Sequence, residues 1–240
     1  MTSSTSKTKG FQFKQFTILD GHSGMPVSTD GVLLGAWAQY TNAERLLDIG
    51  TGTGLLALMS AQRFQHAAIT AIDIDSTAIN DAKRNFAATE WGARLTLLQG
   101  DVLKQSFSER FTGIICNPPY FNSGEVSHNA QRATARHTHT LAHEQLLQRC
   151  HNLLTEEGQA SFVLPTPEGE QFIAMAKQQG WFLTRLCRVQ TTPKKSCHRL
   201  LFTLSKVFEE CKEEHLVIHG DTGGYSADFI TLTNGFYLKM

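Results

Sequence analysis

The residues Asn117-Pro118-Pro119-Tyr120 carry the side chains that could do the most specific chemistry in this chain. Two consecutive prolines remove two backbone donors and fix two φ angles, and Pro118 keeps Asn117 out of the helical region. The carbonyl oxygens of such a stiff corner can accept both N–H protons of a planar amine, while the aromatic ring stacks on its face. The alternative is a strand-ending turn with a surface tyrosine, so the rest of the chain must decide.

A glycine-rich turn is the second candidate site. Gly50, Gly52 and Gly54 follow Asp48 and precede an apolar, helix-like run. Glycines allow a tight turn and leave no Cβ to block a ligand that crosses the strand end. The turn could be purely structural, could bind a dinucleotide through Gly52-x-Gly54-x-x-Ala57, or could bind S-adenosyl-L-methionine. An acidic residue inside the preceding strand favours the last, because that cofactor has a cationic amino-acid end.

Further candidate cofactor contacts stand at strand and helix ends. Asp73 ends a predicted strand roughly 20 residues after the glycine turn, where a carboxylate can bind both ribose hydroxyls. Ile74 follows it, and Asp101 with Val102 follows the next strand, where an adenine ring would lie. Thr29 opens a predicted helix, and such a position either caps the helix or contributes to the rim of a ligand site. Each aspartate also has a plainer interpretation, as a helix cap for Asp73 and as a loop residue for Asp101.

Two basic segments could contact phosphates. Residues 121–140 form a polar loop that begins at Phe121 and contains Arg132 and Arg136; a solvated loop is the alternative. The second segment is a predicted hairpin turn with Lys194, Lys195, His198 and Arg199, which is otherwise a solvated tip.

Three histidines invite a metal interpretation, because they are spaced as His137-x-His139-x-x-x-His143. No carboxylate or cysteine completes the set, so we expect no metal site.

Strands alternate with helices, and the polar candidates cluster at the carboxyl ends of the strands. This order predicts an α/β fold in which a mostly parallel, seven-stranded sheet carries the site over one edge. A short link makes the last two strands an antiparallel hairpin, and Leu216–Ile218 is a possible further edge strand. The expected strands are 46–49, 68–75, 95–99, 114–116, 160–164, 182–189 and 199–204; the expected helices start near 32 and span 55–63, 76–86 (capped by Ser76), 141–154 and 172–179.

Composition narrows the class of protein. Lysine plus arginine and aspartate plus glutamate each number 22, so nucleic acid binding would depend on local patches instead of a basic chain. The five scattered cysteines and the apolar-poor start predict a reduced, cytoplasmic protein without a signal peptide. No apolar run reaches the roughly 18 residues of a membrane span. We expect a flexible tail at 1–10 and a single domain at 11–240.

The ordered set Asp48-x-Gly50-x-Gly52-x-Gly54, Asp73, Asp101 and Asn117-Pro-Pro-Tyr120 resembles the S-adenosyl-L-methionine-dependent amino-methyltransferases, which have a Rossmann-like fold. Further stretches resemble the bacterial enzymes that methylate adenine N6 beside the anticodon of a valine tRNA: Gly10-Phe-x-Phe-Lys-Gln-Phe16, Ser28-Thr-Asp-Gly31, Leu33-Leu-Gly-Ala-Trp37, Ala135-Arg-His137 and Phe236-Tyr-Leu238.

This resemblance implies a tRNA partner and three sets of residues. The catalytic set is Asn117, Pro118 and Tyr120. The cofactor set is Thr29, Asp48, Gly50, Gly52, Gly54, Asp73, Ile74, Asp101, Val102 and Asn117. The substrate set is Pro119, Tyr120, Phe121, Arg132, Arg136, Lys194, Lys195 and Arg199.

Three other functions stay open at this point. The same corner occurs in enzymes that methylate a glutamine side chain of translation factors. A nicotinamide dehydrogenase would use the glycine turn but has no need of the Asn-Pro-Pro-Tyr corner. A non-catalytic RNA-binding protein could keep the fold, and it would bind RNA without forming product.

Overall fold

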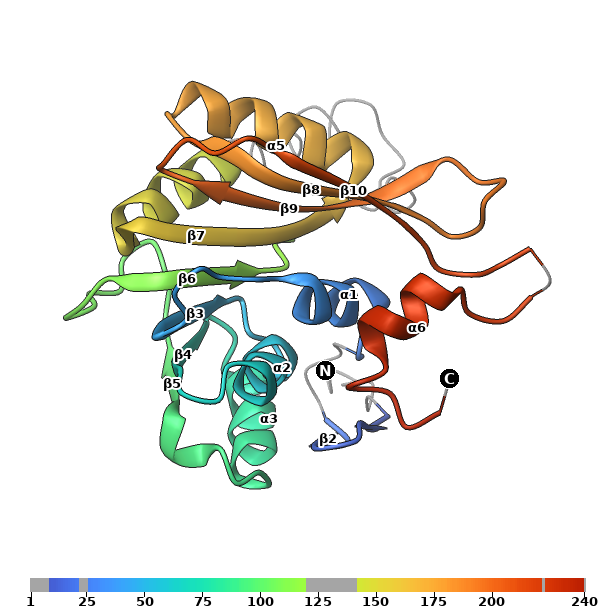
Figure 1. Cartoon of the computed structure of the whole chain (residues 1–240). Helices are drawn as coiled ribbons and strands as arrows, with labels where there is room; N and C mark the ends of the chain where they lie inside the picture. Colours follow the sequence, from blue (N-terminus) through green and yellow to red (C-terminus); the bar gives the residue numbers. More distant parts are fainter. Residues whose placement is uncertain (1–8, 22–25, 120–141, 222, 240) are drawn as a thin grey trace, which may run out of the picture.

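The computed structural model describes residues 9–21, 26–119, 142–221 and 223–239 (Figure 1). Within these ranges a sheet of eight strands forms the centre of the molecule. All neighbours are parallel except β9, which runs antiparallel to β7 and β8. In spatial order the strands are β10 (Lys212–Val217), β8 (Phe182–Gln190), β9 (Cys197–Ser205), β7 (Leu154–Pro165), β6 (Phe111–Cys116), β3 (Arg45–Ile49), β4 (Ala68–Asp73) and β5 (Leu95–Gln99).

The predicted α/β class and the antiparallel hairpin are confirmed, but the expected seven strands are one too few. The additional strand is β10, which pairs in parallel with β8 from Lys212 to Val217 and so is longer than the predicted edge strand. Its first residues are charged and lie at the sheet edge, where alternation of apolar residues is weak.

Strand β7 also begins earlier than predicted. Leu154 pairs with Phe111 and Gln159 pairs with Gly113, and a register irregularity between these pairs accommodates the polar residues 155–158. Glu156-Glu157-Gly158 therefore bulges within the strand, whereas the sequence pattern predicted a strand that begins only at Ala160.

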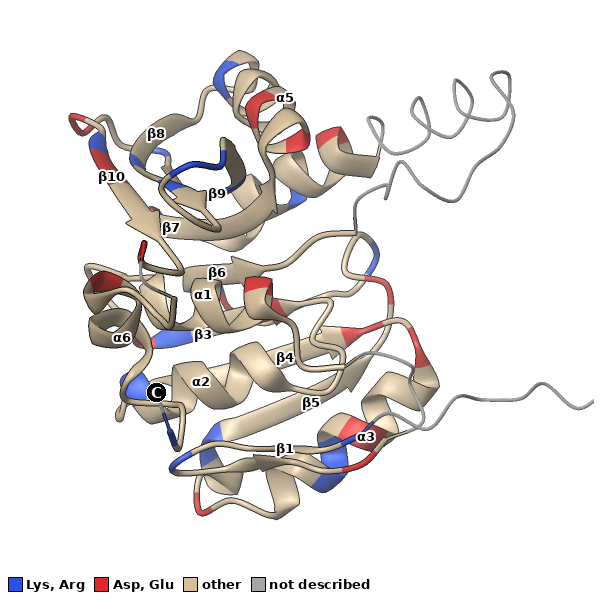
Figure 2. Ribbon diagram, turned by 90° about the vertical axis from the view of Figure 1, so that its right-hand side faces the viewer, with Lys and Arg blue, Asp and Glu red and all other residues tan. Residues whose placement is uncertain are grey.

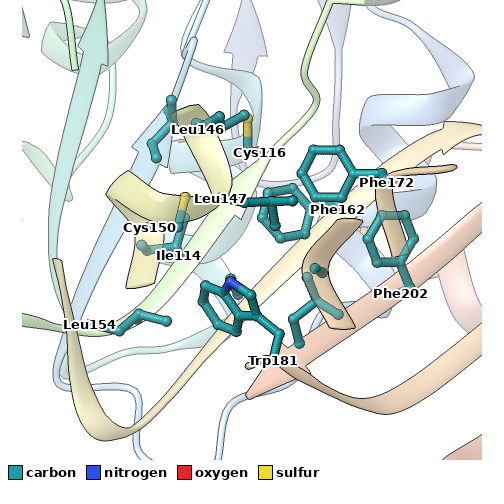
Figure 3. Close-up of a cluster of buried hydrophobic side chains, with 14 of the residues drawn as sticks. Ile114, Cys116, Leu146, Leu147, Cys150, Leu154, Phe162, Phe172, Trp181 and Phe202 are labelled. Atoms are coloured by element: carbon teal, nitrogen blue, oxygen red, sulfur yellow. The ribbon is translucent and has the colours of Figure 1, made fainter. Parts of the chain in front are cut away.

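Helices cover both faces of the sheet. One face carries the helix of residues 142–153 and α5 (Thr166–Gln178). Between these helices and the sheet lies an apolar cluster that includes Trp181, Phe162 and Phe172 (Figure 3). The other face carries α1 (Thr29–Trp37), α2 (Leu55–Arg63), α3 (Ser76–Ala87) and α6 (Ala227–Thr233). No helix in the described ranges has the length and apolar character needed to cross a membrane.

Two helix starts determine which side chains remain available at the sheet edge. Ser28 caps α1 by accepting a hydrogen bond from the Gly31 amide, so Thr29 is the first helical residue. Asp75 caps α3 by accepting from the Thr77 amide, which corrects the prediction that Ser76 is the cap. A carboxylate that accepts from the first-turn amides is a strong cap, and with Asp75 in this role Asp73 is not needed for it.

The two ends of the chain pack together. Strands β1 (Phe11–Gln12) and β2 (Thr17–Ile18) form a short hairpin, and the Lys14 amide donates to the Phe236 carbonyl at 2.8 Å. A short 3-10 helix, η1 (Gly92–Arg94), precedes β5.

Candidate active site

The topology places the glycine turn beside the proline corner. Strands β3 and β6 are parallel neighbours, and their last residues, Ile49 and Cys116, are register partners. Gly50 and Asn117 therefore leave the same edge of the sheet from adjacent strands. The predicted juxtaposition of the two candidate sites is confirmed.

The glycine turn has a left-handed backbone at three positions, with φ of 69° at Gly50, 56° at Gly52 and 85° at Gly54. Its first amide, from Gly50, donates to the Ile72 carbonyl of the neighbouring strand. A Cβ added at Gly54 would lie 2.5 Å from Cε1 of Phe86, whereas one added at Gly50 would meet no atom of the described residues within 4 Å. Gly54 is thus enclosed by protein, and Gly50 faces open space at the sheet edge.

Asp48 is completely buried at the end of β3. Its Oδ2 accepts hydrogen bonds from Thr51 Oγ1 at 2.6 Å and from the Ala57 amide at 3.0 Å. Its Oδ1 is buried and has no hydrogen-bond partner in the described part of the chain. Burial raises the pKa of this carboxyl to about 7, because desolvation outweighs the two hydrogen bonds. A cationic group placed beside Oδ1 would restore the ionised form.

Asp73 links the end of β4 to the glycine turn. Its Oδ2 accepts from the Gly52 amide at 2.8 Å, and its Oδ1 accepts from the Asp75 amide at 2.9 Å. Ile74 beside it is 71% exposed, which is unusual for an isoleucine. Acidic residues are visible around the end of β4 in Figure 2.

The segment after β5 is held by local contacts. Asp101 accepts a hydrogen bond from the Leu103 amide at 3.0 Å and lies 3.7 Å from the Lys104 ammonium. The Val102 carbonyl accepts from Arg149 Nε at 2.9 Å. Because β5 pairs in parallel with β4, this segment leaves the same sheet edge as Asp73.

The corner presents one unsatisfied acceptor. Asn117 Oδ1 is buried and has no hydrogen-bond partner among the described residues. Pro118 is buried, and the Pro119 carbonyl lies 3.2 Å from Nε2 of His143. His143 is itself buried and packs edge-on against Phe172. The amide oxygen of Asn117 is therefore held in place without being used by the protein backbone described here.

The predicted residues Thr29 and Arg199 come to the same edge from other elements. Asp30, next to Thr29 in the first turn of α1, forms an ion pair with Arg199, with 2.8 Å between Oδ2 and Nε. Arg199, on β9, is the register partner of Pro165 at the end of β7, and β7 is the direct neighbour of β6. Lys194 and Lys195 are exposed in the turn between β8 and β9.

Four of the predicted site residues, Tyr120, Phe121, Arg132 and Arg136, lie outside the described residues. The same is true of His137 and His139. In the ranges that are described, no group of three or more His, Cys, Asp or Glu side chains is arranged to hold a metal ion.

Comparison with known proteins identifies the family. The family model described as "Methyltransferase small domain" matches residues 30–180. The tRNA1(Val) (adenine(37)-N6)-methyltransferase of Vibrio vulnificus (strain YJ016) is 61% identical over 240 residues, which is the whole of both chains. The same-named protein of Vibrio campbellii is 63% identical, again over both full lengths. This chain belongs to the tRNA1(Val) (adenine(37)-N6)-methyltransferase family.

Solved structures support the same fold for this methyltransferase. A predicted O-methyltransferase from Agrobacterium tumefaciens aligns with a TM-score of 0.65 at 21% identity, over 86% of this chain and 96% of that chain. A methyltransferase from Pyrococcus furiosus aligns with a TM-score of 0.54 at 20% identity, over 74% of this chain and 81% of that one. At these identities the likeness concerns the fold alone.

One buried residue that contacts the glycine turn of the methyltransferase was not predicted from the sequence. Asn85 of α3 is buried; its Nδ2 donates to the Thr53 carbonyl of the glycine turn at 2.7 Å, and its Oδ1 accepts from the Leu19 amide at 2.9 Å. It thereby connects the N-terminal segment to the turn. A polar residue on the buried side of an amphipathic helix is the sequence signal that could have identified it.

The site fits the cofactor of the family, S-adenosyl-L-methionine. Asp48 Oδ1 offers a buried carboxylate oxygen that a cationic amino group would satisfy, and the open position at Gly50 leaves room for a ligand at the strand end. Asn117 Oδ1 is a second buried acceptor on the adjacent strand. The protein is an S-adenosyl-L-methionine-dependent methyltransferase.

Proposed function

We propose that this enzyme transfers a methyl group to the N6 amine of an adenine in tRNA, at the position beside the anticodon of a valine tRNA. The observation that carries the proposal is Asn117 Oδ1, which is buried, has no hydrogen-bond partner among the described residues and lies on the strand next to the glycine turn. The relatives supply the substrate: their name states adenine 37 of tRNA1(Val). Because its proposed substrate is tRNA, we also assign the enzyme to the cytoplasm.

Cofactor binding is assigned to residues of five elements, namely α1 and the carboxyl ends of β3, β4, β5 and β6. Bound here, S-adenosyl-L-methionine supplies an electrophilic methyl group on a sulfonium. Asp48 would face its amino group. Asp73 would bind ribose hydroxyls in addition to the two backbone amides from which it already accepts hydrogen bonds. The remaining proposed contacts are Thr29, Gly50, Gly52, Gly54, Ile74, Asp101, Val102 and Asn117.

The corner addresses the low nucleophilicity of an adenine amine, whose lone pair is delocalised into the ring. Asn117 Oδ1 and the Pro118 carbonyl would accept hydrogen bonds from the two N–H groups, which orients the amine so that its lone pair is aligned with the methyl group of the sulfonium. These oxygens would also stabilise the positive charge that develops on nitrogen. One oriented group of this kind typically contributes roughly 10²- to 10³-fold in rate. Tyr120 would stack on the base and contribute on the order of 1–3 kcal/mol to binding.

RNA contacts are assigned to Pro119, Lys194 and Lys195, which are exposed, to the partly exposed Arg199, and to Phe121, Arg132 and Arg136, which lie outside the described residues. Arg199 is ion-paired with Asp30, so we expect it to contribute less to RNA affinity than the two exposed lysines. An ion-paired guanidinium releases fewer counterions from the nucleic acid than a solvated ammonium does.

The test is to incubate the purified protein with methyl-labelled cofactor and total tRNA, followed by nucleoside analysis. N6-methyladenosine is the expected product. Label in a glutamine of an added translation factor instead, or no transfer at all, would overturn the assignment.

Asn117→Ala tests the role of the corner. The change should reduce kcat by roughly 10²- to 10³-fold, while calorimetry shows cofactor affinity close to that of the unmodified enzyme. Asn80→Ala, at an exposed position on α3, is the matched control and should change neither quantity. Equal loss of transfer and of cofactor binding in Asn117→Ala would mean that Asn117 acts through cofactor binding or the fold and not on the amine.

A further inference from the structure

A series of stacked aromatic rings reaches the surface after β10. Phe229 of α6 is buried, Tyr225 stacks on it with 4.7 Å between ring centroids, and His219 stacks on Tyr225 at 5.2 Å with an interplanar angle of 18°. Tyr225 is 44% exposed. An antiparallel bridge between His219 and Tyr225 holds the two rings together. The outer end of the series is thus a rigid aromatic surface anchored in the core.

A basic turn lies directly beside this aromatic pair. The His219 amide donates to the Thr191 carbonyl at 2.9 Å, so the loop after β10 is hydrogen-bonded to the turn between β8 and β9. The Lys195 amide in turn donates to the Thr192 carbonyl at 3.0 Å. Lys194 and Lys195 are exposed, and the turn appears as a blue segment facing the viewer in Figure 2. The loop after β10, residues 219–225, also contains one acidic residue, Asp221.

The strand order places this surface at the same edge as the catalytic corner. Strands β8 and β10 run parallel to β6, so their carboxyl ends lie on the edge from which Asn117 projects. Between β10 and β6 there are four inter-strand steps in the order β10-β8-β9-β7-β6. At about 4.8 Å a step, the separation is on the order of 19 Å. That is too far for the base next to the target, but it suits a nucleotide several positions away.

We propose that His219 and Tyr225, together with Lys194 and Lys195, form a second RNA-binding surface of this enzyme. An unpaired base of the substrate RNA stacks on the outer end of the aromatic pair, and phosphates beside that base contact the two lysines. The combination of a fixed aromatic surface and adjacent cations is what sequence-tolerant recognition of single-stranded nucleic acid requires. The inference rests on the proposed tRNA substrate and extends its contacts away from the target adenine.

Tyr225→Ala tests the stacking, because it removes the ring that supports His219 at the outer end of the series, and Tyr225→Phe is the matched control that keeps the ring. Stacking on an aromatic side chain is typically worth roughly 5- to 150-fold in affinity. We therefore expect KM for tRNA to rise about tenfold in Tyr225→Ala, with kcat at saturating tRNA and KM for the cofactor within about twofold of the parent. Tyr225→Phe should resemble the parent. An unchanged KM for tRNA in Tyr225→Ala refutes the stacking.

The doubly substituted Lys194→Gln, Lys195→Gln enzyme tests the surface without removing a packed side chain. The slope of log affinity for tRNA against log salt concentration should fall in magnitude by about 1.4, at about 0.7 per phosphate contact with a single strand. Lys83→Gln, Lys177→Gln removes the same charge from exposed helix positions and should leave the slope unchanged. Equal slopes in both double variants would overturn the surface, as would a lower melting temperature with unchanged RNA affinity in Tyr225→Ala.

These outcomes are separable from failure of the proposed function. If the parent enzyme methylates tRNA while the surface variants bind it like the parent, the second surface alone is wrong. If the parent forms no N6-methyladenosine in tRNA, the function itself is wrong.

Discussion

Asp48 allows the electrostatics of the site to be tested by a stability measurement. Its pKa is raised by burial from 3.8 to about 7. A shift of about three units corresponds to about 4 kcal/mol, at about 1.36 kcal/mol per unit. Below pH 4 the carboxyl is protonated in both the folded and the unfolded state. The contribution of Asp48 to the free energy of unfolding therefore has its highest value there.

As the pH rises from 4 to 7, the unfolded state loses this proton while the folded state keeps it. The contribution of Asp48 to the free energy of unfolding therefore decreases over this window and is constant above pH 7. Asp48→Asn removes the titration and keeps an oxygen that can accept from Thr51 and Ala57. Relative to the parent, the variant should gain about 4 kcal/mol in stability between pH 4 and pH 8.

The assay is urea unfolding of the cofactor-free parent and variant at several pH values. Taking the difference between the two proteins cancels the titration of all other groups. Parallel curves, or a variant that loses relative stability as the pH rises, would show that the buried carboxylate is ionised and well solvated by its neighbours, and the reasoning would fail.

Cofactor binding extends the same prediction. A cationic amino group beside Oδ1 favours the ionised carboxyl, so binding below pH 7 should release a proton. Calorimetry in buffers of different ionisation enthalpy measures that release. The affinity of the parent should rise with pH up to about 7, and that of Asp48→Asn should stay flat.

Two further predictions concern the glycine turn. Gly54→Ala should lower the free energy of unfolding by roughly 3 kcal/mol or more, because a Cβ would lie 2.5 Å from Phe86 at a φ of 85°. Gly50→Ala should lower the free energy of unfolding, measured in urea, by only about 1 kcal/mol but should weaken cofactor affinity. Similar unfolding costs for the two variants would contradict this difference. Asn85→Asp keeps the acceptor for the Leu19 amide but loses the donor to the Thr53 carbonyl. KM for the cofactor should therefore rise about tenfold, while kcat at saturating cofactor is retained. An unchanged KM would show that Asn85 does not position the turn.

The sequence was most informative where local rules determine structure. Two prolines end a strand, glycines with left-handed φ form a turn, and parallel strands bring their carboxyl ends to one edge. These rules suffice to bring Gly50 and Asn117 together, and the register partners Ile49 and Cys116 confirm it. The fold class was predictable for the same reason.

The misses are contacts between residues far apart in the chain or choices between equivalent neighbours. Asp30 and Arg199 are 169 positions apart, and no periodicity relates them, so a residue predicted for RNA contact is found in an ion pair. Asn85 contacts the glycine turn because α3 packs beside it, which depends on tertiary structure. Asp75 and Ser76 are both good caps, and the packing of the β4–α3 connection selects Asp75.

Among the buried oxygens that have no hydrogen-bond partner in the described part of the chain, Asp48 Oδ1 and Asn117 Oδ1 relate the fold to the reaction. Burying a polar atom without a hydrogen bond typically costs about 1–3 kcal/mol, and a ligand that pairs with Asp48 Oδ1 and Asn117 Oδ1 would offset this cost at both atoms. They lie near the ends of adjacent strands, and their chemistry differs: one is a carboxyl with a raised pKa and the other a neutral amide. A cation suits the first and a neutral amine the second. The pair supports the proposal that the donor's charged end binds at β3 and the methyl acceptor at β6, where binding would offset the cost of burying the two oxygens.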